Sequence, residues 1–204
     1  MLLDAAVLAI IVGLIAGGRV SRLKDLNLQG AWLFIMAAVT HIALMALAAR
    51  QAAIPQGLSR GLYLASFGLV LVGLWKNRRL PGIRLVGAGV LLNSLVIAAN
   101  GGSMPVDRQL AVRAGNTRLV RLLDSPTYTN HTPATESTRL RFLADVLPLP
   151  LLVPRPRFFS PGSAGDVLVT AGACWLILAG MGAVPRPAGP RETVEAGSGP
   201  RGET

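Results

Sequence analysis

Apolar residues are gathered into five long stretches of the chain from which charged residues are nearly absent. Each stretch holds roughly 15 to 19 residues, and a helix needs about 20 to cross the hydrocarbon core of a bilayer. The pattern therefore predicts five transmembrane helices. They cover residues 2–18, 31–49, 61–75, 83–99 and 167–184. The third stretch is the shortest, so its helix should extend back toward Gly57 or thin the bilayer around it.

These stretches also predict the organisation of the chain. Residues 1–99 form a four-helix transmembrane region, and residues 100–165 form an extramembrane or interfacial loop region with short helices. Residues 166–184 form the fifth transmembrane helix. Residues 185–204 are rich in Pro, Gly and charge and are expected to be disordered. The predicted fold class is an all-α, polytopic helical membrane protein with a long loop between its fourth and fifth helices.

The placement of basic residues predicts the orientation. The first stretch carries Asp4 near its start and its basic residues after the apolar core, which is the reverse of a cleaved signal peptide. We expect a multi-pass protein of the cell membrane with its N-terminus outside and its C-terminus in the cytoplasm. The two short loops then predicted inside hold seven basic residues: Arg19, Arg22, Lys24, Lys76, Arg78, Arg79 and Arg84. The short external loop holds Arg50 and Arg60, whereas eight arginines in residues 100–165 count against this orientation.

The excess of 20 Lys and Arg over 10 Asp and Glu limits the partners. The basic residues cluster at the ends of apolar stretches, which favours the lipid bilayer and its anionic headgroups over nucleic acid. We therefore expect no nucleic-acid partner. The single cysteine, Cys174, excludes an intrachain disulfide and reads as a small buried apolar residue.

Two polar residues, His41 and Asn93, fall inside predicted membrane helices and need hydrogen-bond partners. They lie at similar depth, so each is a candidate partner for the other. Interhelical hydrogen bonds that fix packing are favoured over a proton or substrate path. Glycines recur in the same helices, at Gly13, Gly17, Gly87, Gly89, Gly172 and Gly180. Close packing within one bundle is the favoured interpretation, with a homo-oligomer left open.

The long loop shows three local patterns. Two short basic amphipathic helices are predicted, from about Asp107 to Ala114 and from a cap at Asn116 to about Leu123, with Gly115 ending the first. Residues 142–153 are apolar but too short to span, which suits a re-entrant or interfacial segment. His131 lies in a turn-rich polar stretch and is expected to be solvated.

The candidate site lies at the ends of the fourth and fifth helices. Gly101 and Gly102 suit a helix C-cap with positive φ. Asp166 begins the fifth helix, where a carboxylate stabilises the exposed amides, whereas Asp145 has no such role if a helix already begins at Thr138. The hypothesis is that one polar site gathers Asn100, Gly101, Gly102, Arg139, Asp145 and Asp166.

No motif for a catalytic nucleophile, a metal, a phosphate or a dinucleotide occurs in the sequence. We therefore predict no catalytic residue, no metal site and no cofactor. The favoured function is a non-enzymatic bundle that binds a lipid, an ion or an unidentified protein partner. The alternative is a small membrane transporter or an enzyme acting on an envelope lipid, with Asp145 and Asp166 as working carboxylates.

Several motifs together resemble a known family. They are "NGGSMPV" after an apolar helix, "TRLRFLADVLPLP", and "FSPGSAGDVLV" at the start of the last helix. They are similar to those of the bacterial membrane-protein family called domain of unknown function 5317. The resemblance covers nearly the whole chain, as far as about Gly182. Ala144 departs from the expected Gly, and the proline of the last motif, Pro161, makes its turn longer or stiffer. The resemblance implies a membrane location and no particular activity.

Overall fold

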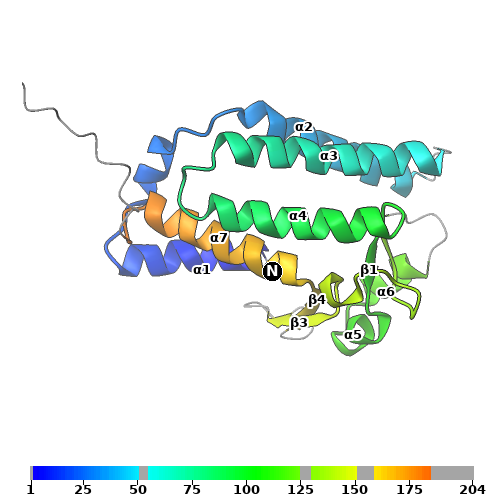
Figure 1. Cartoon of the computed structure of the whole chain (residues 1–204). Helices are drawn as coiled ribbons and strands as arrows, with labels where there is room; N and C mark the ends of the chain where they lie inside the picture. Colours follow the sequence, from blue (N-terminus) through cyan, green and yellow to red (C-terminus); the bar gives the residue numbers. More distant parts are fainter. Residues whose placement is uncertain (1, 51–54, 125–129, 151–158, 185–204) are drawn as a thin grey trace, which may run out of the picture.

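Five long helices lie roughly along one common axis, and a small domain lies at one end of them (Figure 1). The computed structural model describes residues 2–50, 55–124, 130–150 and 159–184. The predicted disordered tail, residues 185–204, lies outside the described residues. The long helices are α1 (Leu2–Ile15), α2 (Ala31–Ala49), α3 (Gln56–Lys76), α4 (Ile83–Ala99) and α7 (Ala164–Gly180).

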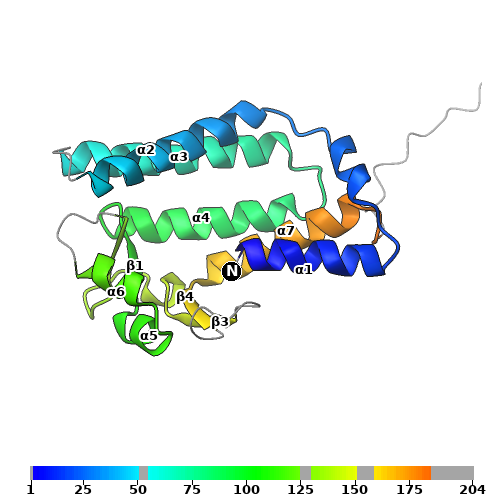
Figure 2. The same cartoon turned by 180° about the vertical axis from the view of Figure 1, so that it is seen from behind.

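Successive long helices alternate in direction, as both views of the molecule show (Figures 1 and 2). One end of the bundle holds the short helix η1 (Val20–Asp25), the turn between α3 and α4, and the end of α7. The other end holds the small domain, which follows α4 and precedes α7. Helix α4 packs on α7 and α3, while α2 packs on α3 and α1 on α7. Helix α4 is therefore the central element of the bundle.

The predicted apolar stretches match the helices closely. Helices α2 and α4 begin and end where predicted, and α3 extends back to Gln56, as its short apolar stretch required. Helix α7 begins three residues before the predicted Val167, because Ser163 caps it. Thus the prediction of a mostly helical chain is confirmed.

Glycines bring α4 and α7 into close contact at two levels. A Cβ atom built on Gly172 would lie 2.5 Å from the carbonyl oxygen of Gly82, and one on Gly89 would meet the carbonyl oxygen of Gly165. At the end of α1, a Cβ atom on Gly13 would lie 2.7 Å from the sulfur of Met181. These contacts confirm packing within one bundle at these positions, because only glycine leaves room for the neighbouring chain.

The small domain contains strands, so the all-α prediction is wrong for this part of the chain. Strand β1 (Met104–Val106) pairs in parallel with β2 (His131–Pro133), and β3 (Leu147–Pro150) pairs antiparallel with β4 (Phe159–Gly162). The predicted re-entrant segment, residues 142–153, is described as far as Pro150. It consists of the end of the short helix η2 (Arg141–Leu143), a bend, and strand β3. Its prolines explain the difference, since a strand edge tolerates residues that lack an N–H.

Two short helices of the small domain occur as predicted. They are α5 (Arg108–Arg113) and α6 (Thr117–Leu123). The Asp107 carboxylate accepts the Leu110 N–H at 2.9 Å, and the Asn116 side-chain oxygen accepts the Leu119 N–H at 3.1 Å. Gly115 adopts φ +68° between them. Local capping chemistry therefore sets both boundaries.

The buried core lies where the small domain meets the bundle, and the outer faces of the long helices remain apolar. The core joins Leu44, Tyr63, Val96, Ile97, Met104 and Ala144. Among the described residues, one helix, Gly57–Lys76 within α3, has the length and hydropathy needed to cross a membrane. Helices α1, α2, α4 and α7 are apolar but shorter than that criterion requires.

Candidate functional site

A closed hydrogen-bond network joins α4 to the start of α7. The Asn93 side-chain amide donates to Asp166 Oδ1 at 2.9 Å, and the Ser163 hydroxyl donates to Asn93 Oδ1 at 2.8 Å. Ser163 and Asp166 also form a capping box, in which each side chain accepts the other residue's backbone N–H. Asn93 therefore locks the first turn of α7 against α4, and Asp166 has a structural role that its local sequence predicts.

Asp145 is held in the small domain through its backbone. Its N–H donates to the Pro105 carbonyl oxygen, and its own carbonyl oxygen accepts the Asp107 N–H, both at 3.0 Å. Val106 and Asp145 form a parallel β-bridge, on the opposite side of β1 from β2. Asp145 is therefore an extended residue shortly after η2. The helix that was expected to begin at Thr138 does not form.

The carboxyl group of Asp145 lies in an unusual environment. Its Oδ1 atom is buried and has no hydrogen-bond partner among the described residues. Burial raises the pKa of Asp145 to about 7, and the negative charge of Asp166 contributes to the rise. The structure thus places Asp145 and Asp166 close enough for the charge of Asp166 to act on the Asp145 carboxyl group.

His131 lies close enough to Asp166 to sense its charge. The residue pairs with Met104 across the parallel strands and is half-buried, so the expectation of a solvated loop is wrong. Burial lowers the pKa of His131, while the charge of Asp166 opposes that shift. Sequence reasoning missed this residue because the pairing of β1 with β2 joins segments far apart in the chain.

Asn100 and Arg139 form a second pair at the same end of the bundle. The Asn100 amide donates to the Arg139 carbonyl oxygen at 2.9 Å and accepts the Arg139 N–H at 3.0 Å. The Arg139 side chain is exposed, and no ion pair between described residues joins it to Asp145 or Asp166. Arg139 therefore contributes its backbone, and the Asn100 side chain fastens the small domain to the end of α4.

Gly101 and Gly102 end α4 in the predicted manner. Their φ angles are +69° and +88°, and the Gly102 N–H donates to the Ile97 carbonyl oxygen at 2.8 Å. The side chain of Arg60 from α3 lies over this turn, 2.7 Å from where a Cβ atom of Gly102 would stand. Its Nε atom is buried and has no hydrogen-bond partner among the described residues. These glycines thus have a structural role and also let α3 approach the turn.

His41 and Asn93 each have a partner, but they do not pair with each other. His41 Nε2 lies 2.6 Å from the Ser66 hydroxyl, and the ring packs on Tyr63 and Phe67 at centroid distances of 4.9 and 5.6 Å. Helix α2 packs mainly on α3, whereas Asn93 points to α7. The hypothesis of a mutual pair is therefore wrong, while the expectation of packing hydrogen bonds is confirmed.

The Asp145 carboxyl group and its neighbours Asp166 and His131 form a cluster that can bind a proton. Within the described ranges, no group of three or more His, Cys, Asp or Glu side chains is placed to hold a metal ion. Asp166 is committed to the cap of α7, whereas the Asp145 carboxyl has an oxygen free of hydrogen bonds. Ser163, like His131, was missed from the sequence; the pattern Ser-x-x-Asp before an apolar run was the signal for it.

A helical bundle carrying a small β-containing domain, joined by a polar network between α4 and α7, defines the class of this protein. The chain belongs to the family described as "Family of unknown function (DUF5317)", whose model matches residues 25–178. An uncharacterised protein of Thermotoga maritima is 30% identical over 172 residues, which cover 84% of this chain and 87% of that protein. No solved structure matches the chain. The family expected from the sequence motifs is thereby confirmed.

Proposed function

We propose that this protein is an integral membrane protein with five spans, which binds its partners without catalysing a reaction. The observation that carries the proposal is the apolar outer surface of the long helices. Ile15 is 82% exposed, Ile42 65% and Trp75 69%. Two large apolar side chains are also exposed on each of α4 and α7: Leu91, Leu95, Val167 and Trp175. Such a surface needs a lipid environment, because large apolar patches on a water-soluble monomer favour aggregation.

The alternating directions of the helices support an orientation for this bundle. The seven basic residues of the two short loops all belong to the end that carries η1 and the α3–α4 turn. By the positive-inside rule this end faces the cytoplasm, with the C-terminus. The N-terminus and the small domain then lie outside. Anionic lipid headgroups are the partners this arrangement favours at the basic end.

Alkaline extraction of membranes tests the proposal. Sodium carbonate at high pH strips peripheral proteins and leaves proteins that span the bilayer in the pellet. We expect the protein to sediment with the membranes and to enter solution with detergent. Release of the protein by carbonate alone would contradict the proposal, because five apolar helices cannot leave a bilayer without detergent.

A second candidate function rests on Asp145. A carboxyl group that exchanges its proton near neutral pH, beside Asp166, suits a small transporter or an enzyme acting on an envelope lipid. Against it stands the commitment of Asp166 to the α7 cap and to Asn93. The non-enzymatic function is favoured because one free carboxyl lacks the partner that a two-carboxylate mechanism needs.

The titration of Asp145 gives a testable pH dependence. Because its pKa is raised to about 7, the folded protein binds more protons than the unfolded chain between about pH 4 and 7. The free energy of unfolding should therefore fall as pH rises through this window, by up to about 1.4 kcal/mol per pH unit from this group. Asp145→Asn, which stays neutral, should flatten the profile measured by thermal unfolding in detergent.

The matched control is Asp25→Asn, since Asp25 is exposed at the other end of the bundle. This variant should retain the wild-type slope. If Asp145→Asn retained it as well, another group would account for the titration, and the second candidate function would lose its support.

A further inference from the structure

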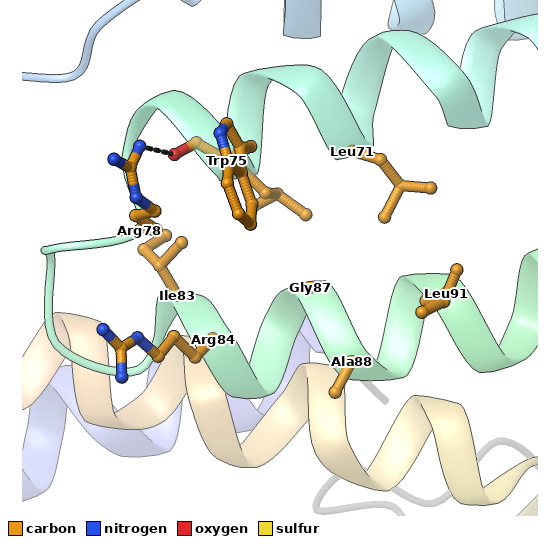
Figure 3. A pocket seen from close by; sticks show the side chains of 9 residues that line it. Leu71, Trp75, Arg78, Ile83, Arg84, Gly87, Ala88 and Leu91 are labelled. Carbon is orange, nitrogen blue, oxygen red and sulfur yellow. Dashed lines mark hydrogen bonds between the residues drawn. The ribbon is translucent and has the colours of Figure 1, made fainter.

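A groove between α3 and α4 lies open at the basic end of the bundle. Its volume is about 500 Å³, within the range of roughly 300–1,000 Å³ that small-molecule sites occupy. The side chains of Leu71 and Trp75 on α3 face α4, where Gly87 and Ala88 offer little side chain in return (Figure 3). A Cβ atom built on Gly87 would meet no other atom within 4 Å. The described residues therefore do not fill this space.

The two ends of the groove differ in chemistry. Toward the middle of the bundle it is lined by Leu71 and Leu91, while Arg78 and Arg84 flank its other end, beside the α3–α4 turn (Figure 3). Arg78 donates to the Trp75 carbonyl oxygen at 3.1 Å, and its guanidinium lies 4.9 Å from the Trp75 ring centroid. In the part of the chain that the structure describes, neither arginine forms an ion pair with a carboxylate.

The groove is apolar along its length and ends at two guanidinium groups that have no counter-charge among the described residues. This chemistry is complementary to a phospholipid. Acyl chains match the apolar lining, and a phosphate diester matches the guanidinium groups, which bind phosphate through paired N–H donors. Trp75, 69% exposed, stands at the depth where indole rings favour the headgroup region. A helix from a second copy of the chain fits less well, because it would bury both guanidinium groups without a counter-charge.

We propose that the groove between α3 and α4 binds one acidic phospholipid, with an acyl chain along Leu71, Gly87 and Leu91 and the phosphate held by Arg78 and Arg84. This inference rests on the proposed membrane function and names the lipid class that the bundle selects. The groove lies at the end assigned to the cytoplasm, where anionic lipids are concentrated. The bound lipid completes the surface between α3 and α4, and its negative charge offsets part of the positive charge of the two arginines.

Quenching of Trp75 fluorescence by brominated lipids tests the proposal. The variant used for this test has Trp32→Phe and Trp175→Phe, so that Trp75 is its single tryptophan. It is placed in phosphatidylcholine vesicles that contain increasing fractions of brominated phosphatidylglycerol, or of brominated phosphatidylcholine as the neutral comparison. A guanidinium near an anionic headgroup contributes about a factor of five, and Arg78 and Arg84 act together, so half-maximal quenching should need roughly 25-fold less of the acidic lipid.

Four variants separate the possible results. Arg78→Gln with Arg84→Gln should abolish the preference for the acidic lipid, whereas Lys24→Gln with Arg79→Gln, at the same end but outside the groove, should preserve it. Gly87→Leu, which fills the groove, should abolish the preference while both arginines remain. A protein that keeps Trp32 alone, 62% exposed on α2, should show a weaker preference for the acidic lipid than the protein that keeps Trp75.

Equal quenching by both lipids, or a preference that survives the double Arg→Gln change, would overturn the inference and leave the membrane function intact. Absence of quenching by either lipid at Trp32 and Trp75 alike would instead overturn the membrane function itself. A change of molar mass in Gly87→Leu, with the lipid preference unchanged, would assign the groove to a second copy of the chain and reject the lipid.

Discussion

Gly89→Ala should separate α4 from α7 and lower the free energy of unfolding by about 3 kcal/mol or more, since overpacking of a tight core costs about 1–3 kcal/mol where the neighbours can yield. Here they cannot yield easily. The added Cβ atom would meet the Gly165 carbonyl oxygen and would lie 2.8 Å from both the backbone nitrogen and Cγ2 of Val169. Backbone atoms move only with their helix, so the whole of α7 must shift. Thermal unfolding in mild detergent measures the effect.

Gly68→Ala is the matched control for this substitution. Gly68 also lies inside a long apolar helix, α3, but a Cβ atom there meets no other atom within 4 Å. Alanine should be neutral at this position or stabilising by up to about 1 kcal/mol through helix propensity. Equal stability of Gly89→Ala and Gly68→Ala would show that α4 and α7 do not cross as closely as described.

Asn93→Ala should have the second-largest effect, lowering the free energy of unfolding by roughly 2–4 kcal/mol, because buried polar groups that lose their partners cost about 1–3 kcal/mol each and charged groups more. The change removes the donor to Asp166 Oδ1 and the acceptor of the Ser163 hydroxyl at once. Because Ser163 directly follows β4, the small domain should also detach more readily from α4. Limited proteolysis of the small domain reports this second effect.

Ser94→Ala provides the neighbouring control. Among the residues that the structure describes, the Ser94 hydroxyl bonds only to the Val90 carbonyl oxygen of its own helix, at 2.7 Å. Its loss should therefore change the unfolding free energy by less than about 1 kcal/mol. If Asn93→Ala were as stable and as resistant to protease as Ser94→Ala, the network between α4 and α7 would not hold the small domain in place.

The parts of this fold that the sequence predicts are those governed by local chemistry. Helix α4 ends at Asn100 because two glycines with positive φ and a proline follow it. The caps at Asp107 and Asn116 likewise depend on residues three positions away. Apolar stretches and helix caps depend on neighbouring residues alone. This is why the sequence predicts the positions of the long helices and of α5 and α6.

The parts that the sequence did not predict depend on contacts between distant segments. Strand β1 has three residues, too few for an alternating pattern, and its partners around His131 and Asp145 come much later in the chain. The raised pKa of Asp145 follows from burial that only this pairing creates. His41 bonds to Ser66 because α2 packs on α3, and hydropathy carries no information about which helices are neighbours.

The placement of the two ends of the bundle on opposite sides of a membrane is the central claim, and cysteine accessibility tests it most directly. In a Cys174→Ser background, Ser137→Cys places a thiol on the small domain and Ser21→Cys places one on η1, both at exposed positions. Intact cells are treated with a membrane-impermeant maleimide before and after lysis.

We expect Ser137→Cys to be labelled in intact cells and Ser21→Cys to be labelled only after lysis. The reverse pattern would keep the bundle in the membrane but invert it, which would place the small domain in the cytoplasm. Identical labelling of the two positions would contradict the claim, because the two ends of the bundle would then share one compartment.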